Sequence, residues 1–264
     1  MSTALASETV AALAERLDHA ETSRTDTPSL ADTHTFGIED AYAVQAALLA
    51  RREARGERIT GVKLGFTSKA KMAQMGVSDV IVGRLTDAMR VADGADVDLS
   101  RFLHAKAEPE VAYRLARDVD LDDPSVDIEA CVDALAPALE FIDSRYRDFR
   151  FTYEDVVADN TSASAYAIGA WRPVANAGDV SNRAVRLLSG SAEAVGSTAA
   201  ILGSPVRALH ALLDMARRRR IPLRAGQVVL AGAATAAVPV TPGVISCEVA
   251  GLGSVSVSVK GVAS

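Results

Sequence analysis

The apolar and polar residues of the N-terminal part of the chain follow the period of an α-helix. The first seventeen residues place their apolar side chains at helical spacing, which predicts an amphipathic helix. A polar stretch, residues 22–35, interrupts this pattern. A second helix is predicted from Ile38 to about Arg55, with Gly56 as its stop signal. The pattern therefore indicates an N-terminal helical segment over residues 1–60.

After Thr60, short β-prone runs bounded by Gly, Asp and Pro replace the helical pattern. Strands are expected at Val62–Phe66, Val80–Leu85, Glu110–Leu115, Leu139–Ile142, Val228–Ala231, Ile245–Val249 and Val255–Val259. Helices are expected at Ser68–Met75, Ile128–Ala134, Tyr153–Asp159 and Pro205–Arg220. Because strands and helices mix without regular βα alternation, we expect an α+β body over residues 61–264 rather than a doubly wound sheet, and one domain overall.

The amino-acid composition argues against several classes of function. The 264 residues are 49% hydrophobic and 23% charged, as in ordinary globular proteins, and the net charge is −6. An acidic chain with 5% aromatic residues is a poor candidate for nucleic-acid binding. Cys131 and Cys247 form no CxxC pair, and no apolar run is long enough for a membrane span. We expect a soluble, cytoplasmic protein.

Three glutamates are candidate ligands of a metal ion. Glu108 and Glu110 are two residues apart, so on a strand they share one face at roughly 6.5–7 Å spacing. A solvated edge strand beside Pro109 would produce the same pattern. Glu140 lies inside the apolar run 138–142, where a buried carboxylate needs a partner. Oxygen ligands alone would favour Mg²⁺ or Mn²⁺ over zinc.

Other polar residues can be interpreted either as part of a functional site or as ordinary structural residues. Lys63 is a charge within a short apolar strand between glycines, and a half-exposed strand would also explain it. The clusters 143–145 and 158–162 are compatible with a site or with turn and helix-cap chemistry. Thr235 is a lone hydroxyl among alanines, where a ligand could approach the backbone, although a packed turn looks the same.

Five motifs in order carry a family resemblance that spans about residues 36–259. They are Gly61-Val62-Lys63-Leu64-Gly65-Phe66-Thr67-Ser68, Glu108-Pro109-Glu110, Leu139-Glu140-Phe141-Ile142-Asp143-Ser144-Arg145, Val157-Ala158-Asp159-Asn160-Thr161-Ser162 and Gly251-Leu252-Gly253-Ser254-Val255. The series resembles the hydratase/decarboxylase family of the meta-cleavage pathway for aromatic compounds, within the fumarylacetoacetase-like superfamily. The stretches 143–149 and 196–203 look closer to the decarboxylase branch.

The resemblance implies a fold, a metal and a reaction. It implies a mixed β-roll body preceded by helices, and Mg²⁺ or Mn²⁺ held by Glu108, Glu110 and Glu140. The implied reaction is loss of the distal carboxylate of 2-oxo-3-hexenedioate as CO₂, giving 2-hydroxypenta-2,4-dienoate. The metal would stabilise the enolate as a Lewis acid.

The resemblance also suggests roles for individual side chains. Lys63 would donate to the 2-oxo group, and Arg145 would either bind the distal carboxylate or hold the carboxylate cluster in place. The remaining candidates are Asp159, Asn160 and Ser162 as orienting catalytic residues, and Ser68 and Thr235 as contacts of the substrate.

Two alternatives stay open. Hydration of 2-hydroxypenta-2,4-dienoate would use the same metal site, whereas a noncatalytic partner subunit would have no need for buried charges. We expect a small 2-oxo dicarboxylic acid as substrate and a homo-oligomer as the assembly. The family also suggests a complex with a hydratase of the pathway.

Overall fold

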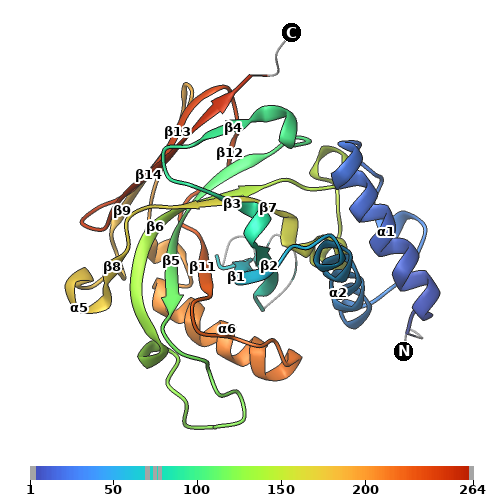
Figure 1. Cartoon of the computed structure of the whole chain (residues 1–264), viewed down its shortest axis with the longest axis horizontal. Coiled ribbons are helices and arrows are strands. Elements are labelled where there is room, and N and C mark those ends of the chain that lie inside the picture. Colours follow the sequence, from blue (N-terminus) through green and yellow to red (C-terminus); the bar gives the residue numbers. More distant parts are fainter. Residues whose placement is uncertain (1–3, 69–71, 74–75, 77–78, 262–264) are drawn as a thin grey trace.

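The computed structural model describes residues 4–68, 72–73, 76 and 79–261. Its helices are α1 (Ser7–Ser23), α2 (Ile38–Ala54), α4 (Tyr153–Ala158), α5 (Val174–Ala177) and α6 (Pro205–Arg219). Helices α1 and α2 lie side by side at one end of the molecule, and α4 contacts α2 (Figure 1). Helix α6 covers β11 of the main sheet. The helical N-terminal segment is thus an additional layer beside the sheets.

The described strands form two sheets. The larger sheet contains β1 (Ile59–Gly65), β2 (Ile81–Thr86), β3 (Arg90–Val91), β5 (Lys106–Leu115), β6 (Val132–Ile142), β7 (Ala163–Ile168), β8 (Arg172–Pro173), β11 (Val228–Ala233) and β12 (Val238–Pro239). Its order is β2-β1-β11-β5-β6-β7-β3, with β12 beside β5 and β8 beside β6. The smaller sheet contains β4 (Asp96–Asp98), β9 (Ala184–Ser189), β10 (Ala192–Ser197), β13 (Gly243–Val249) and β14 (Gly253–Lys260), in the order β10-β9-β13-β14-β4.

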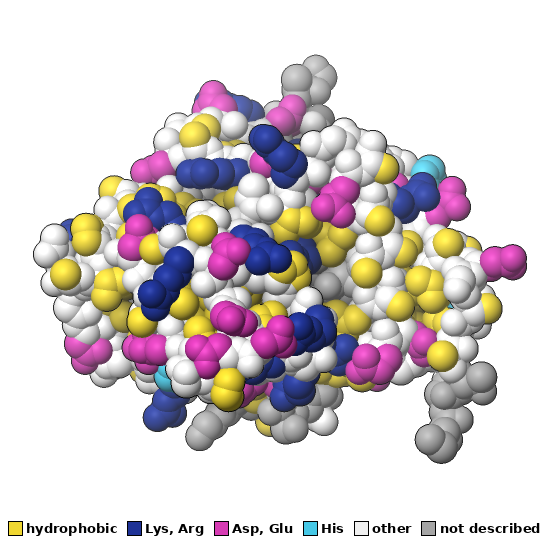
Figure 2. Space-filling model, turned by 60° about the horizontal axis from the view of Figure 1, so that its bottom comes forward, with side chains coloured by type: hydrophobic (Ala, Val, Ile, Leu, Met, Phe, Trp, Pro, Cys, Tyr) yellow, Lys and Arg dark blue, Asp and Glu magenta, His cyan; other side chains and the backbone are white. Residues whose placement is uncertain are grey.

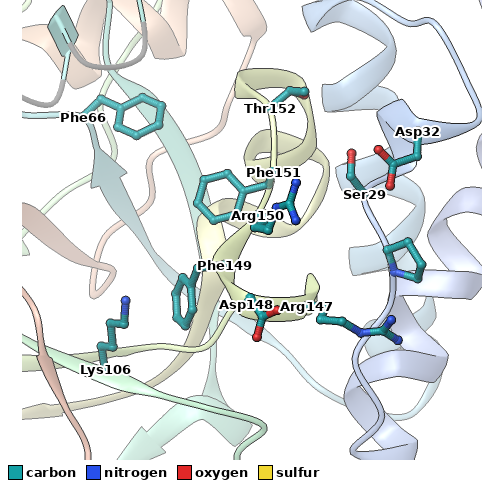
Figure 3. A pocket seen from close by; sticks show the side chains of 11 residues that line it. Ser29, Asp32, Phe66, Lys106, Arg147, Asp148, Phe149, Arg150, Phe151 and Thr152 are labelled. Carbon is teal, nitrogen blue, oxygen red and sulfur yellow. The ribbon is translucent and has the colours of Figure 1, made fainter.

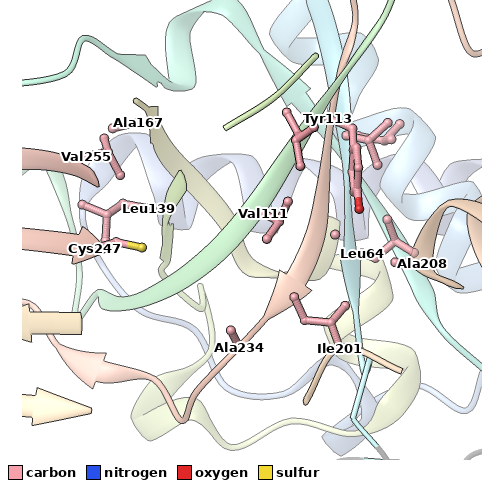
Figure 4. Packing of buried hydrophobic residues seen from close by; sticks show 14 of the residues in the cluster. Leu64, Val111, Tyr113, Leu139, Ala167, Ile201, Ala208, Ala234, Cys247 and Val255 are labelled. Atoms are coloured by element: carbon pink, nitrogen blue, oxygen red, sulfur yellow. The ribbon is translucent and has the colours of Figure 1, made fainter. Parts of the chain in front are cut away.

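The main hydrophobic core fills the space between one face of the larger sheet, the smaller sheet and α6. Leu139 of β6 packs near Cys247 of β13 and Val255 of β14, while Val111 of β5 lies closer to α6 (Figure 4). Successive side chains of a strand point to opposite faces, so these odd-numbered positions of β5 and β6 all face this core. The even-numbered positions face the other way.

That second face combines small residues with a few large ones. Ala112, Ala136 and Ala138 lie on adjacent strands and pack with Leu230 and other buried residues in a separate cluster. Small side chains on one face allow a sheet to curl toward that face. The same face carries the charged positions of β5 and β6 toward one end of the strands, where the candidate site lies.

A capped helix ties the N-terminal segment to the site. Helix α4 is capped by Thr152, whose side chain accepts from Asp155 N–H while the Asp155 carboxylate accepts from Thr152 N–H. The same carboxylate accepts from the Ser29 hydroxyl at 2.5 Å and from Leu30 N–H at 3.0 Å. The segment before α2 is therefore anchored to the helix that leads directly into Asp159.

Most elements expected from the pattern are present, with one clear error. The helix expected at Ile128–Ala134 is wrong: a single helical turn ends at Cys131, and β6 starts at Val132. The long pairing of β6 with β5 overrides the local preference of this segment. Seven described strands (β3, β4, β7, β8, β9, β10 and β12) and helix α5 were not expected. Most of the helix expected at Ser68–Met75 lies outside the described residues.

The distribution of charged side chains and the length of the helices can be compared with what binding to nucleic acids or crossing a membrane requires. Figure 2 shows one face of the molecule, on which basic and acidic side chains are interspersed. This arrangement differs from the continuous basic stripe that is typical of nucleic-acid binding. Among the described residues, no helix is both long enough and apolar enough to cross a membrane.

Candidate functional site

Three glutamates meet on the curled face of the larger sheet. Glu108 of β5 pairs directly with Glu140 of β6, and Glu110 follows two residues later on the same face of β5. One carboxylate oxygen from each side chain lies within 4.8 Å of the other two, and all three residues are buried. Cross-strand pairing and the two-residue strand period thus bring together carboxylates that are 30 residues apart in sequence.

The oxygens of this glutamate triad fit a hard cation. Oε1 of Glu110 and Oε1 of Glu140 are buried and accept no hydrogen bond from the described residues, whereas Oε2 of Glu140 contacts a lysine ammonium at 3.0 Å. Oε2 of Glu110 accepts from the Gly232 N–H at 2.7 Å. Buried carboxylates without donors are costly, and an ion that takes oxygen ligands, such as Mg²⁺ or Mn²⁺, removes that cost.

Gly232 is required by the geometry beside the triad. The pairing of β11 with β5 shifts its register between Leu230 and Ala233, so the Gly232 N–H is available to Glu110. Its φ is +108°, and a Cβ placed there would lie 2.0 Å from Oγ1 of Thr67. Any larger residue would displace Thr67 or the bulge and remove a donor from the triad.

Lys63 is the cation in contact with the triad. Its Nζ lies 3.0 Å from Oε2 of Glu140 and donates to the carbonyl of Thr161 at 3.1 Å. Burial alone would lower the pKa of Lys63, but Glu140 and the other two glutamates raise it above its ordinary value. The side chain is therefore a buried ammonium, not an outward-facing lysine.

The Lys63–Glu140 contact also shows that the larger sheet is curved. Strands β11 and β5 lie between β1 and β6, so in a flat sheet the two backbones would be about 14 Å apart, at roughly 4.8 Å per strand. The ion pair forms because the sheet curls and brings its concave face together. The site depends on this curvature as much as on the residues.

Glu110→Gln is expected to stabilise the metal-free protein. Burial raises the pKa of Glu110 well above its ordinary value, and Glu140 raises it further, so folding disfavours the ionised form. Glutamine still accepts from the Gly232 N–H without the charge. We expect a gain on the order of 1–4 kcal/mol in the free energy of unfolding at pH 8, the size found when buried charges are replaced by neutral groups.

The pH dependence tests the cause. The folded-state pKa lies above the unfolded value near 4.5, so the penalty is absent below that value, grows as pH rises above it, and levels off once pH exceeds the folded-state pKa. Urea unfolding of EDTA-treated parent and variant should therefore give a difference that shrinks from pH 8 to pH 5. An equal difference at both pH values would contradict the electrostatic explanation.

A left-handed turn presents the partner of Lys63. Asn160, Thr161 and Ser162 have φ values of +48°, +54° and +58°, a run of three non-glycine residues in the left-handed region. Such residues cost roughly 1–2 kcal/mol each. The Asn160 amide offsets part of this cost by donating to Arg84 C=O at 2.9 Å and accepting from Arg84 N–H at 2.7 Å. The turn thereby aims the Thr161 carbonyl at Lys63.

Gly83 makes room for this turn. A Cβ at Gly83 would lie 2.1 Å from Oγ1 of Thr161 and 2.7 Å from the carbonyl of Asn160. Because both contacts involve the turn itself, a side chain at this position would push the turn away from the sheet.

Arg145 and Asp159 form a fully buried pair behind the turn. The Arg145 Nε donates to Asp159 Oδ1, and its Nη2 donates to the Asp159 carbonyl at 2.5 Å. Nη1 donates to the carbonyls of Asp143 and Ala163 at 2.9 and 3.1 Å. Burial alone would lower the pKa of Arg145, but Asp159 raises it. Every guanidinium nitrogen is thus used within the protein.

A cavity of about 490 Å³, here called the inner cavity, opens over the triad. Lys63 and Glu108 line it, together with Ser68, Thr235 and Ser162. The Ser162 hydroxyl is buried and has no hydrogen-bond partner among the described residues. The Thr235 hydroxyl donates to the Ala236 carbonyl at 2.9 Å. Arg145, Asp159 and Asn160 do not line the inner cavity.

A second cavity of about 780 Å³, the outer cavity, adjoins the inner one. Phe66, Lys106, Phe149 and Phe151 line both cavities. Figure 3 shows these four side chains on one side of the outer cavity, with Ser29 and Asp32 facing them from the N-terminal segment (Figure 3). None of these four side chains was among the site residues expected from the sequence.

A signal for Lys106 does exist in the sequence. It lies two residues before Glu108, so on a strand it shares the face of Glu108 and Glu110. The expected strand began at Glu110, four residues too late, and the relation was missed. Thr161 contributes through its backbone carbonyl, and a sequence motif offers no sign of such a role.

The chain is similar over nearly its whole length to curated bacterial lyases. It is 46% identical over 254 residues to a 4-oxalocrotonate decarboxylase from Pseudomonas sp., covering 96% of this chain and 98% of that protein. It is 37% identical over 224 residues to a 2-keto-4-pentenoate hydratase from Paraburkholderia xenovorans (strain LB400), covering 83% of each. No protein-family model matches the chain.

Solved structures share the fold. The 4-oxalocrotonate decarboxylase from Pseudomonas putida G7, complexed with magnesium and adipate, superposes with a TM-score of 0.91 at 36% identity, covering 98% of this chain and 100% of that one. A putative fumarylacetoacetate hydrolase family protein from Yersinia pestis CO92 has a TM-score of 0.56 at 15% identity over 75% of this chain and 92% of its own. The second likeness shows the fold alone. The expected fumarylacetoacetase-like α+β fold is confirmed.

Proposed function

The chain belongs to the family that contains 4-oxalocrotonate decarboxylases and 2-keto-4-pentenoate hydratases, and on that basis we propose that it is a metal-dependent decarboxylase. The proposed reaction converts 2-oxo-3-hexenedioate to 2-hydroxypenta-2,4-dienoate and CO₂. The observation that carries the proposal is a buried ammonium that contacts one of three convergent, buried glutamates beneath one cavity. The 46% identity with that decarboxylase also exceeds the 37% identity with that hydratase.

Glu108, Glu110 and Glu140 would hold the cation. Three convergent carboxylates suit Mg²⁺ or Mn²⁺, and the donor set contains no sulfur or imidazole that would favour zinc. When bound, the cation would supply Lewis acidity at the 2-oxo acid end of the substrate.

Lys63 would act on the oxygen that gains charge. When the C5–C6 bond breaks, its electron pair forms the C4=C5 double bond, C3=C4 shifts to C2=C3, and the charge ends on the 2-oxo oxygen. The Lys63 ammonium lines the inner cavity, where it can donate a hydrogen bond and then a proton to that oxygen. The carboxyl carbon leaves as CO₂, so atoms and charge balance with one proton taken up.

The other predicted residues fall into two groups. Ser162, Ser68 and Thr235 line the inner cavity and are proposed to contact substrate or water. Asp159 and Asn160 are proposed as positioning residues, because neither lines the cavity: Asn160 ties the left-handed turn to Arg84, and Asp159 pairs with Arg145 behind it. Of the two roles considered for Arg145, its fully used guanidinium favours holding the site together over binding the distal carboxylate.

Removal of the metal is expected to abolish activity. Treatment with EDTA should reduce CO₂ release from 2-oxo-3-hexenedioate below detection, and addition of Mg²⁺ or Mn²⁺ should restore it, because the three carboxylates alone provide no electrophile. EDTA already saturated with Mg²⁺ serves as the matched control and should have no effect. Full turnover by protein with verified zero metal content would overturn the proposal.

The same purified protein should be assayed with 2-hydroxypenta-2,4-dienoate. Hydration is the second candidate function, supported by the identity with the hydratase and by the unpartnered Ser162 hydroxyl, which could orient a water. Hydration without CO₂ release would assign the chain to that branch. A noncatalytic role would require both activities to be absent in metal-loaded protein, and the buried charges argue against it.

Some expectations go beyond this site. A cytoplasmic location, a homo-oligomer, a complex with a pathway hydratase and a domain boundary near residue 60 stay predictions.

A further inference from the structure

We propose that Lys106 binds the second carboxylate of the substrate and so selects dicarboxylic over monocarboxylic 2-oxo acids. The proposal rests on the proposed function, since it assumes that the 2-oxo acid end lies at the glutamate triad. It assigns a specificity role to a residue that no motif in the sequence marked.

Lys106 lies at a suitable distance from the triad. It is the first residue of β5 and shares a face with Glu108 and Glu110, and both Lys106 and Glu108 line the inner cavity. Two residues of a strand span roughly 6.5–7 Å. This is comparable to the separation of the two carboxyl groups in an extended six-carbon diacid. A diacid with one end at the triad can therefore reach Lys106 with the other.

Of the cations that line the inner cavity, Lys106 is the one that can bind a substrate carboxylate. Among the described residues that line it, Lys63 and Lys106 are the cations, and Lys63 already contacts Glu140. Arg145 is buried behind the left-handed turn, and each of its guanidinium nitrogens donates a hydrogen bond within the protein. No carboxylate of the described residues forms an ion pair with Lys106. A second substrate carboxylate would supply the missing counter-charge.

An aromatic side chain holds Lys106 in place. The Lys106 Nζ lies 4.1 Å from the centre of the Phe149 ring, and the His104 ring lies 4.8 Å from the same ring centre. The His104 Nε2 is 2.7 Å from the Ser144 carbonyl, so this stack is itself anchored. Figure 3 shows Lys106 and Phe149 adjacent at the wall shared by the two cavities. A half-buried ammonium held this way loses less freedom on binding a carboxylate.

Lys106 is expected to contribute to substrate binding and not to the rate of the chemical step. The distal carboxylate carries full charge in the bound substrate and loses it as CO₂ forms. An ammonium beside it is therefore most favourable before the reaction, not in the transition state. Loss of Lys106 should raise KM and leave kcat unchanged or slightly higher.

Binding of a matched pair of inert ligands tests the proposal. 2-Oxoadipate and 2-oxohexanoate have the same length, differ by a carboxylate against a methyl group, and lack the double bond needed for decarboxylation. Calorimetric titration with Mg²⁺ present should show that Lys106→Met weakens 2-oxoadipate about 10- to 100-fold, as expected for a lost hydrogen bond to a charged group. Binding of 2-oxohexanoate should be unchanged, which also shows that the variant is folded.

Two further variants make the result specific. Lys106→Arg should restore most of the preference for the diacid. Arg150→Met removes an exposed cation that lines only the outer cavity, and it should leave the preference intact. An unchanged preference in Lys106→Met, or an equal loss in Arg150→Met, would overturn the proposal. If wild-type protein prefers 2-oxoadipate through Lys106 but releases no CO₂ from 2-oxo-3-hexenedioate, the proposed function fails and the Lys106 assignment stands.

Discussion

Glu140→Ala is expected to abolish metal binding and, with it, decarboxylation. Glu140 supplies one of three convergent carboxylates and also contacts Lys63, so its loss removes a ligand and leaves the ammonium without its nearest counter-charge. The affinity for Mg²⁺ should fall by more than the roughly 10–100-fold that loss of an outer-shell partner costs. The fold should survive, because one source of repulsion among the carboxylates is removed. Calorimetry with Mg²⁺ and circular dichroism measure both effects.

Asp143→Asn provides the matched control for Glu140→Ala. Asp143 is a buried carboxylate near Glu140, but its oxygens accept from the N–H groups of Leu103 and His104 at 2.7 and 2.8 Å. This variant should keep its affinity for Mg²⁺. The reverse pattern, with normal metal binding by Glu140→Ala and loss in Asp143→Asn, would show that Asp143 completes the site and Glu140 is a structural charge.

Lys63→Met is expected to lower kcat by about 10²–10³, far more than it weakens metal binding. In the proposed reaction the ammonium faces an oxygen whose negative charge grows as CO₂ leaves, so its contribution would be largest in the transition state. Methionine is similar in length and suits a position that is 3% exposed. The measurement compares steady-state kcat with the Mg²⁺ affinity of the same preparation.

The control for this variant is Lys260→Met. Lys260 is an exposed lysine on β14 that pairs with Asp96, and its replacement should be nearly silent. Wild-type turnover by Lys63→Met would remove Lys63 from the mechanism, whereas loss of folded structure would make its role structural.

Local pattern was sufficient for the long helices and for seven of the fourteen described strands. The 3.6-residue period of α2 and α6, and the turn residues around β1, β11 and β13, are encoded by neighbouring residues. The glutamate triad could also be predicted, because Glu108 and Glu110 share a strand face by spacing and Glu140 is a charge in an apolar run. These signals need no knowledge of tertiary structure.

The remaining features arise from contacts between distant segments. Arg145 has the same sequence signature whether it faces a substrate or Asp159, and only the packing of the turn decides this. The strand that replaces the expected helix at Ile128–Ala134 depends on pairing with β5. Lys106 was missed because its strand begins four residues earlier than its β-prone core suggests. Curvature of the sheet, which brings Lys63 to Glu140, leaves no trace in a local pattern.

The left-handed turn at residues 160–162 has a consequence for the order of folding. Its conformation has no intrinsic support, so it depends on Arg84 and Lys63, which are 76 and 98 residues away in sequence. The entropy cost of closing loops of that length must be met before these contacts can stabilise the turn. We therefore expect the turn to form after the sheet has assembled and to be among the first parts lost on heating. Catalytic competence would then appear late in refolding and disappear before the secondary structure does.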